Sequence, residues 1–114
     1  MPTPSRLLAC GFALLFAASA SAEPRLKALI VDGQNNHDWK STTPLLKKHL
    51  EDSGLFTVDV ATSPGGTDLA GFEPKFADYQ VVVSNYNGAA WPKATQDALV
   101  AFVHDGGGFV VVHA

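Results

Sequence analysis

The strongest constraint on the fold is a set of four short apolar runs, rich in β-branched residues, separated by stretches of different character. The runs are LKALIVDG (26–33), LFTVDVATS (55–63), QVVVSN (80–85) and FVVVH (109–113). Runs that are apolar almost throughout are typical of strands buried on both faces, as in a parallel sheet. The second run alternates in polarity, which also predicts a strand.

Helical signals lie between these strands. After the first run, residues 41–43 offer a cap, Pro44 suits a first turn and Gly54 is placed to end the helix. A second helix is predicted to begin at Pro92 and to end at the glycines 106–108. Its apolar stripe comprises Ala98, Leu99, Phe102 and Val103.

The order of these elements predicts the fold class. Residues 64–79 are rich in glycine and proline, so we expect a loop with a short helical turn, held to the core by Leu69, Phe72 and Phe76. Strands that alternate with helices predict an α/β, doubly wound parallel sheet in a flavodoxin-like three-layer sandwich, with right-handed crossovers. Because the sequence stops as an apolar strand finishes, we interpret 23–114 as the N-terminal part of a longer domain, truncated after its fourth strand.

The first 22 residues have the pattern of a cleaved secretory signal peptide. Arg6 is followed by the apolar LLACGFALLFAASA, which is too short to span a bilayer, and ASA at 20–22 is a cleavage signature. We expect cleavage after Ala22 and a secreted or periplasmic protein, with a retained anchor as the alternative. The mature part would contain no cysteine, since Cys10 is the only one. Disulfides, a thiolate nucleophile and a cysteine zinc site are therefore excluded from it.

The charge of the mature part excludes one class of partner. Removing Arg6 from the eight basic residues leaves seven against eleven acidic ones, a net charge of about −4 with histidine neutral. We expect neither nucleic-acid binding nor membrane attachment after signal cleavage, and homo-oligomerisation stays open.

Two polar loops follow neighbouring strands of the expected sheet. The first loop carries Asp32, Asn35, Asn36, His37, Asp38 and Trp39, and the second carries Asn85, Tyr86, Asn87, Gly88 and Trp91. In an open α/β sheet, ligands bind beyond the carboxyl ends of the strands where the strand order reverses. For the order 2-1-3-4 this point lies between the first and third strands, so we expect both loops to line one crevice. His113, at the end of the fourth strand, would join the same rim.

These side chains suit a carbohydrate, with a peptide or an amide as the alternative. Aromatic rings offer flat apolar faces, and amides, carboxylates and imidazoles offer donors and acceptors in fixed directions. The predicted stacking residues are Trp39, Tyr86 and Trp91, and the predicted polar contacts come from Asn35, Asn36, Asn85, Asn87 and Gly88. The candidate catalytic residues are His37 and His113 for proton transfer, with Asp32 or Asp38 orienting an imidazole.

Each of these residues also has a purely structural interpretation. Asp32 can cap loop backbone, the asparagines of the first loop suit left-handed turns, and the tryptophans can cover the end of the sheet. The dipeptide 87–88 is a common turn, and His113 is also compatible with a buried strand. The His37–Asp38 pair is too small a set of ligands for a metal site, so neither a metal nor a cofactor is expected.

Three stretches together resemble the start of a ThuA-like (trehalose-utilisation) domain. They are LIVDGQNNHDWKSTTPLLKKHLEDSG (29–54), PKFADYQVVVSNYNGAAWP (74–92) and FVHDGGGFVVVHA (102–114). The resemblance covers essentially 25–114 and implies the class I glutamine amidotransferase-like fold. It also implies a role in the metabolism of trehalose and related disaccharides, in a family whose secreted bacterial members carry signal peptides.

The sequence departs from the amidotransferase pattern at one position. In those enzymes a strand like FVVVHA leads into the nucleophilic cysteine, whereas here His113 and Ala114 stand at the strand end. Imidazole cannot replace the thiolate in a thioester intermediate, so cysteine-dependent glutamine amide transfer is not expected. We therefore predict a secreted domain that acts on or binds a trehalose-like disaccharide, a glucoside or an oxidised derivative. A non-catalytic sugar-binding or accessory domain of a larger secreted protein is the alternative.

Overall fold

The computed structural model describes residues 22–113. Its elements are β1 (Leu26–Asp32), α1 (Trp39–Asp52), β2 (Phe56–Thr62), the 3₁₀ turn η1 (Phe76–Asp78), β3 (Val81–Ser84), α2 (Lys93–His104) and β4 (Gly108–Val111). The signal peptide predicted at 1–22 lies outside the described residues, apart from Ala22. Between residues 22 and 113, no helix has the length and apolar character needed to cross a membrane.

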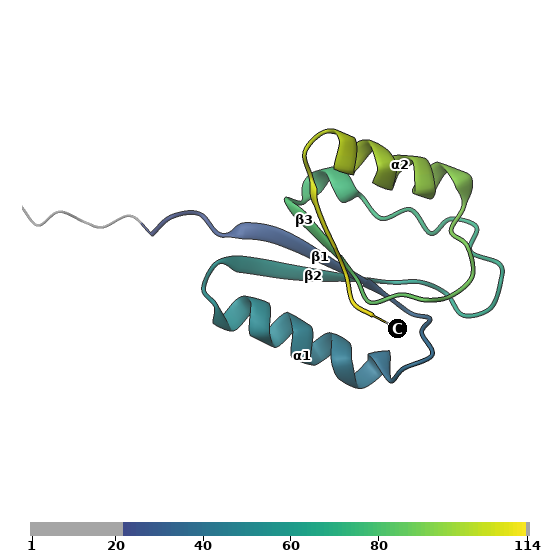
Figure 1. Cartoon of the computed structure of the whole chain (residues 1–114), viewed down its shortest axis with the longest axis horizontal. Coiled ribbons are helices and arrows are strands. Elements are labelled where there is room, and N and C mark those ends of the chain that lie inside the picture. Colours follow the sequence, from purple (N-terminus) through teal and green to yellow (C-terminus); the bar gives the residue numbers. More distant parts are fainter. Residues whose placement is uncertain (1–21, 114) are drawn as a thin grey trace, which may run out of the picture.

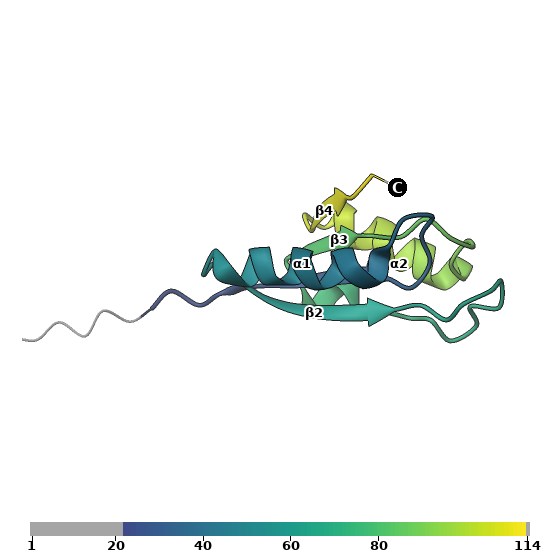
Figure 2. The same ribbon diagram turned by 90° about the horizontal axis from the view of Figure 1, so that it is seen from below.

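The four strands form one parallel sheet in the order β2-β1-β3-β4. Helix α1 covers one face of this sheet, and α2 with η1 covers the other (Figures 1 and 2). The predicted α/β class, doubly wound sheet and three-layer arrangement are confirmed. Since β1 and β3 are neighbours, the strand order reverses between them, and both carboxyl ends open at the same edge.

The core is divided between the two faces of the sheet. Under α2 and η1 the buried residues are Leu29, Val31, Leu69, Phe72, Phe76, Val82 and Phe102, and under α1 they are Ala28, Ile30, Val58 and Val83. Strand β1 contributes to both sets, which explains why its sequence is apolar almost throughout. The predicted anchoring of the 64–79 segment by Leu69, Phe72 and Phe76 is confirmed.

Helix α1 begins earlier than the sequence predicts. Its N-cap is Asp38, whose carboxylate accepts hydrogen bonds from the Ser41 N–H at 3.2 Å and the Ser41 hydroxyl at 2.6 Å. The expected cap residues at 41–43 are therefore inside the helix, as is Pro44. Pro44 cannot donate to the carbonyl of Lys40, but Lys40 is exposed, so water can satisfy that carbonyl. The predicted end at Gly54 is confirmed by its φ of 75°.

Two expectations for the C-terminal elements are wrong. Of the predicted α2 stripe, Phe102 is buried and Leu99 packs against the core, but Ala98 and Val103 are exposed, and Thr95 is buried in addition. Strand β4 ends at Val111 and all its residues are exposed, because in the described part of the chain it pairs only with β3. His113 lies beyond this strand and is exposed, so it does not end a buried strand.

Candidate functional site

The loops that follow β1 and β3 lie side by side at the carboxyl edge of the sheet. The Asn35 side chain donates from Nδ2 to Oδ1 of Asn85 at 3.2 Å. Further along, Nδ2 of Asn87 donates to Oδ1 of Asn36 at 3.0 Å. Each loop contributes a donor and an acceptor, so the expected pairing of these two loops is confirmed.

Asn85 is the buried centre of this arrangement. It is 2% exposed, and its Nδ2 donates to the Thr42 hydroxyl at 3.0 Å and to the Thr43 hydroxyl at 3.1 Å. Together with the bond from Asn35, these contacts join the end of β3 to the β1 loop and to the first turns of α1. Almost none of the surface of Asn85 is open to a ligand, so its role is to stabilise the arrangement of the loops through these hydrogen bonds.

Gln34 joins the same two loops to a third and was not among the predicted site residues. Its Oε1 accepts the Ala89 N–H at 3.0 Å, and its backbone carbonyl accepts the Asn87 N–H at 2.9 Å. Its Nε2 donates to the carbonyls of Pro64 and Gly66, at 2.8 Å each, in the loop that follows β2. The signal in the sequence was its position directly after Gly33 at the end of a buried strand.

The two predicted carboxylates are engaged with neighbouring backbone and hydroxyl groups. Asp32 is 2% exposed, and its Oδ1 accepts the Thr62 hydroxyl of β2 at 2.6 Å. Asp38 caps α1, and the hydroxyl and N–H of Ser41 hold the pKa of this carboxyl below its ordinary value. Neither carboxylate is hydrogen-bonded to an imidazole within residues 22–113. The orienting roles predicted for them stay predictions.

The predicted histidines lie at the same edge of the sheet. His37 is exposed, and its backbone N–H donates to Oδ1 of Asn35 at 2.8 Å, which fixes the direction in which the β1 loop leaves the strand. His113 follows β4, one strand beyond β3, where Val112 still donates to the Ser84 carbonyl at 2.9 Å. No hydrogen bond links His113 to either polar loop in the part of the chain that the structure describes.

The predicted aromatic residues are placed in different surroundings. Trp91 packs against Phe72, Phe76 and Tyr86, with ring centroids 6.0, 6.1 and 5.3 Å away. The hydroxyl of Tyr86 donates to the Ala89 carbonyl at 2.6 Å, so this ring also supports the β3 loop.

Trp39, in contrast, is the first residue of α1 and half-buried, with the ammonium group of Lys40 5.7 Å from its ring centroid. The ring contacts of Trp91 are with Phe72, Phe76 and Tyr86, and among residues 22–113 none joins it to Trp39.

Gly88 completes the contact between the loops. A Cβ at this position would lie 2.3 Å from Cβ of Gln34, well inside contact distance. Its φ is not in the left-handed region, so the requirement is for space and not for an unusual backbone conformation. Gly88 is exposed, and it lies where the β3 loop contacts Gln34 of the β1 loop.

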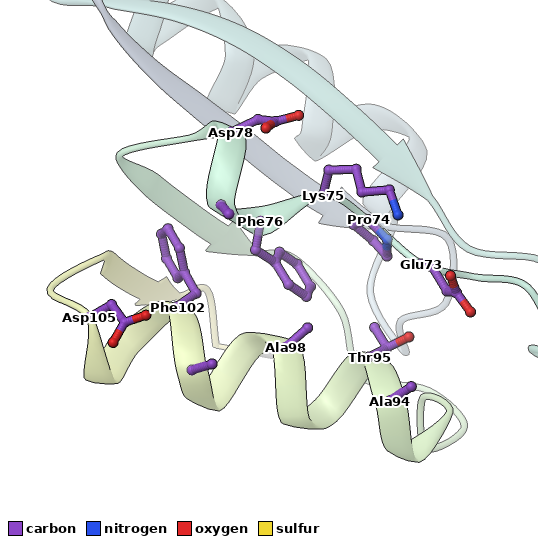
Figure 3. A pocket seen from close by; sticks show the side chains of 12 residues that line it. Glu73, Pro74, Lys75, Phe76, Asp78, Ala94, Thr95, Ala98, Phe102 and Asp105 are labelled. Carbon is purple, nitrogen blue, oxygen red and sulfur yellow. The ribbon is translucent and has the colours of Figure 1, made fainter.

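A separate cavity of about 420 Å³ lies between η1 and α2. It is lined by Phe76, Phe102 and small residues of α2, together with the charged residues Glu73, Lys75, Asp78 and Asp105. None of the predicted site residues borders it. Figure 3 shows Phe76 pointing from η1 towards α2, whereas Asp78 points away from the helix. The exposed lining of this cavity is mainly apolar, whereas the predicted polar side chains meet at the two loops, so we place the candidate site at the loops. Among residues 22–113, no three His, Cys, Asp or Glu side chains are grouped to hold a metal ion.

Comparisons with known proteins point in one direction. A family model described as ThuA, trehalose utilisation, matches residues 27–114. The crystal structure of a protein from Parabacteroides merdae ATCC 43184 that is described as ThuA-like is 44% identical and superposes with a TM-score of 0.77. The match covers 80% of this chain and 33% of that one, so the chain spans about a third of that protein's length. A search of curated proteins found no match.

Proposed function

We propose, starting from the fact that the chain belongs to the trehalose-utilisation (ThuA) family, that it binds or acts on a disaccharide or glucoside at the joined loops of β1 and β3. Family membership supports a role connected with carbohydrates. The identity of the sugar and the choice between binding and catalysis belong to the proposal.

The observation that carries it is the hydrogen bond between Asn36 and Asn87. Because Asn36 accepts through Oδ1 and Asn87 donates through Nδ2, this bond leaves Nδ2 of Asn36 as a donor and Oδ1 of Asn87 as an acceptor for a ligand. Both residues are exposed. A sugar hydroxyl can donate and accept, so two adjacent hydroxyls of a pyranose ring match this pair. The half-buried ring of Trp39 offers an apolar face in the adjoining first turn of α1.

If the site is catalytic, we infer that histidine carries out the proton transfer. Asp32 is bound to Thr62, and Asp38 caps α1, so within residues 22–113 the two loops offer no pair of free carboxylates for ordinary glycoside hydrolysis. His37 is exposed beside the amide pair, and an imidazole can act as a general acid or base. We infer that His37 is the first candidate for proton transfer, with His113 as the second. A non-catalytic sugar-binding domain remains the alternative function.

Titration calorimetry with trehalose, maltose and methyl α-glucoside tests the proposal. We expect Asn36→Ala and Asn87→Ala each to weaken binding about tenfold, since each removes one hydrogen-bonding partner of the sugar and disturbs the other. If no sugar binds the unaltered protein, or if both variants bind as well as it does, the proposed site is wrong.

A second measurement separates an enzyme from a binding domain. Turnover of the bound sugar, followed by chromatography, is expected to be lost in His37→Ala while most of the affinity stays. His104→Ala is the matched control, because His104 is exposed in the last turn of α2, away from the loops. Full turnover in His37→Ala would remove this residue from the mechanism.

We also propose that the protein is exported through the leader at 1–22. The positive residue, the short apolar stretch and the ASA signature of the leader support this. Fusion of residues 1–30 to alkaline phosphatase, which is active only outside the cytoplasm, should give active enzyme, whereas Leu14→Arg and Leu15→Arg together should abolish the activity.

A further inference from the structure

The side chain of Gln34 uses both of its N–H donors and its carbonyl oxygen in contacts between loops. Both hydrogens of Nε2 are donated to the 64–66 segment, and Oε1 accepts from the β3 loop through Ala89. One carboxamide therefore connects the exits of β1, β2 and β3. The connection lies at the carboxyl edge of the sheet, directly beside the proposed sugar contacts at Asn36 and Asn87.

Two glycines let the backbones approach this closely. A Cβ on Gly88 would overlap Gln34, and a Cβ on Gly33 would lie 2.4 Å from the carbonyl oxygen of Ser63. Side chains are thus absent on both sides of Gln34, where the β3 loop and the β2 loop press against the β1 loop. The same feature at both contacts indicates that the three loops form one unit.

The loop after β2 depends on this contact for its position. Residues 64–68 are exposed, and only Ser63 and Leu69 on either side of them are buried. A Cβ added at Gly65 or Gly66 would meet nothing within 4 Å, and both residues are exposed, so little side-chain packing holds them. Ordering such a segment costs conformational entropy, which the two bonds from Gln34 offset.

We propose that Gln34 is a positioning residue of the carbohydrate site, and that it makes the Pro64–Gly66 segment a third wall of that site. This inference rests on the proposed function and extends it to a loop that none of the site predictions included. A third wall would contact the part of a disaccharide that extends past the Asn36–Asn87 pair, so it would contribute to affinity for disaccharides more than for a single glucoside.

The variant Gln34→Glu tests this with little change of shape. It keeps the acceptor for the Ala89 N–H, removes both donors to Pro64 and Gly66, and sets a carboxylate against their carbonyls. We expect nitrogen-15 relaxation to show the Gly65 and Gly66 amides becoming mobile, with order parameters below about 0.6. Trehalose binding should weaken about tenfold at neutral pH, and methyl α-glucoside binding should change less.

Lowering the pH should partly restore the sugar affinity of Gln34→Glu, which would not happen if the variant had simply lost its structure. Once protonated, the carboxyl that Gln34→Glu introduces regains one of the two donors and loses its charge, so the affinity of the variant relative to the unaltered protein should recover in part as pH falls below about 4.3. Gln80→Glu is the matched control, since Gln80 accepts the Lys27 N–H at the opposite end of the sheet. It makes the same change of charge and should alter neither loop motion nor affinity.

The outcomes separate the two proposals. An ordered 64–66 segment in Gln34→Glu, or a mobile segment with unchanged trehalose affinity, overturns the positioning role. If the unaltered protein binds none of the sugars, both the proposed function and the role of the 64–66 segment in sugar binding are wrong. The relaxation data still decide whether Gln34 holds the loop. Should Gln34→Glu not fold, Gln34→Met removes the same donors without adding charge and is read in the same two ways.

Discussion

At the scale of the residue, side chains with similar chemistry have different tasks. Asn85 and Asn87 are two positions apart, yet Asn85 is buried against threonines of α1 and Asn87 is exposed. The sequence predicted both as ligand contacts because composition and spacing do not reveal which amide points inwards. That depends on the partner that each finds across the loop, which only the folded chain defines.

Replacing Asn85 should therefore cost more stability than replacing Asn87. Asn85→Ala leaves Thr42, Thr43 and Asn35 without a shared partner, and we expect the free energy of unfolding to fall by about 1–3 kcal/mol. Asn87→Ala removes one exposed contact and should change it by less than about 0.5 kcal/mol. Urea denaturation of both variants checks this, and equal losses would contradict the central role of Asn85.

Gly88 offers a second test at this scale. Gly88→Ala forces a Cβ into Gln34, so we expect a loss of about 1–3 kcal/mol in unfolding free energy together with weaker sugar binding. Gly65→Ala is the matched control for stability alone, because nothing lies within 4 Å of its Cβ position. Thermal unfolding of the pair measures the difference in stability, and calorimetry of Gly88→Ala measures the loss of sugar binding. A neutral Gly88→Ala would mean that the two loops can separate without cost.

At the scale of the element, the apolar runs were sufficient to locate the strands, because burial on both faces leaves a strong pattern. The start of α1 was misplaced, since several residues between Asp38 and Thr43 can cap a helix and the sequence does not rank them. Strand β4 has the apolar pattern of a buried strand but is exposed. An apolar pattern shows that a strand is suited to burial, but it does not show whether another element covers the strand.

The cap of α1 predicts a dependence on pH. The hydrogen bonds from Ser41 lower the pKa of Asp38 in the folded state, so its stabilising effect is present above the unfolded pKa and is lost as pH falls through the folded pKa. Asp38→Asn keeps a capping side chain that does not titrate.

Thermal unfolding followed by circular dichroism, between about pH 5 and pH 2, should show a smaller drop in midpoint for Asp38→Asn than for the unaltered protein. Asp38→Ala should lower the midpoint at neutral pH as well. Identical acid sensitivity in Asp38→Asn and the unaltered protein would exclude this carboxylate as a source of it.

At the scale of the whole molecule, the strand order and the meeting of two distant loops followed from general rules of α/β sheets. The ThuA resemblance is confirmed by the family match over 27–114 and by the similar crystal structure. The third loop could not be predicted, because it is joined to the site by a single glutamine and by backbone carbonyls, which carry no signal in a sequence.

The exposed strand β4 predicts self-association. Phe109, Val110 and Val111 are 39, 51 and 63% exposed on a strand whose outer edge is unpaired within residues 22–113. Such an edge pairs readily with another strand, so we expect a chain that ends at residue 114 to associate at high concentration. Val111→Lys should shift it towards monomer in sedimentation velocity, whereas Leu45→Lys, at an apolar residue of α1 that is 55% exposed, should not. Equal effects of the two substitutions would indicate nonspecific hydrophobic association instead of strand pairing at the edge of the sheet.

The contrasting surroundings of the two tryptophans have a practical consequence. The indole of Trp91 is enclosed by aromatic rings, with its Nε1 buried and unpartnered among the described residues, so its fluorescence should lie to the blue and report the integrity of the core. The indole of Trp39 is half in solvent beside a lysine, so its emission should lie to the red and respond to quenchers and to a sugar stacking on it. Occupancy and denaturation should therefore be distinguishable by wavelength in one spectrum, without an added dye.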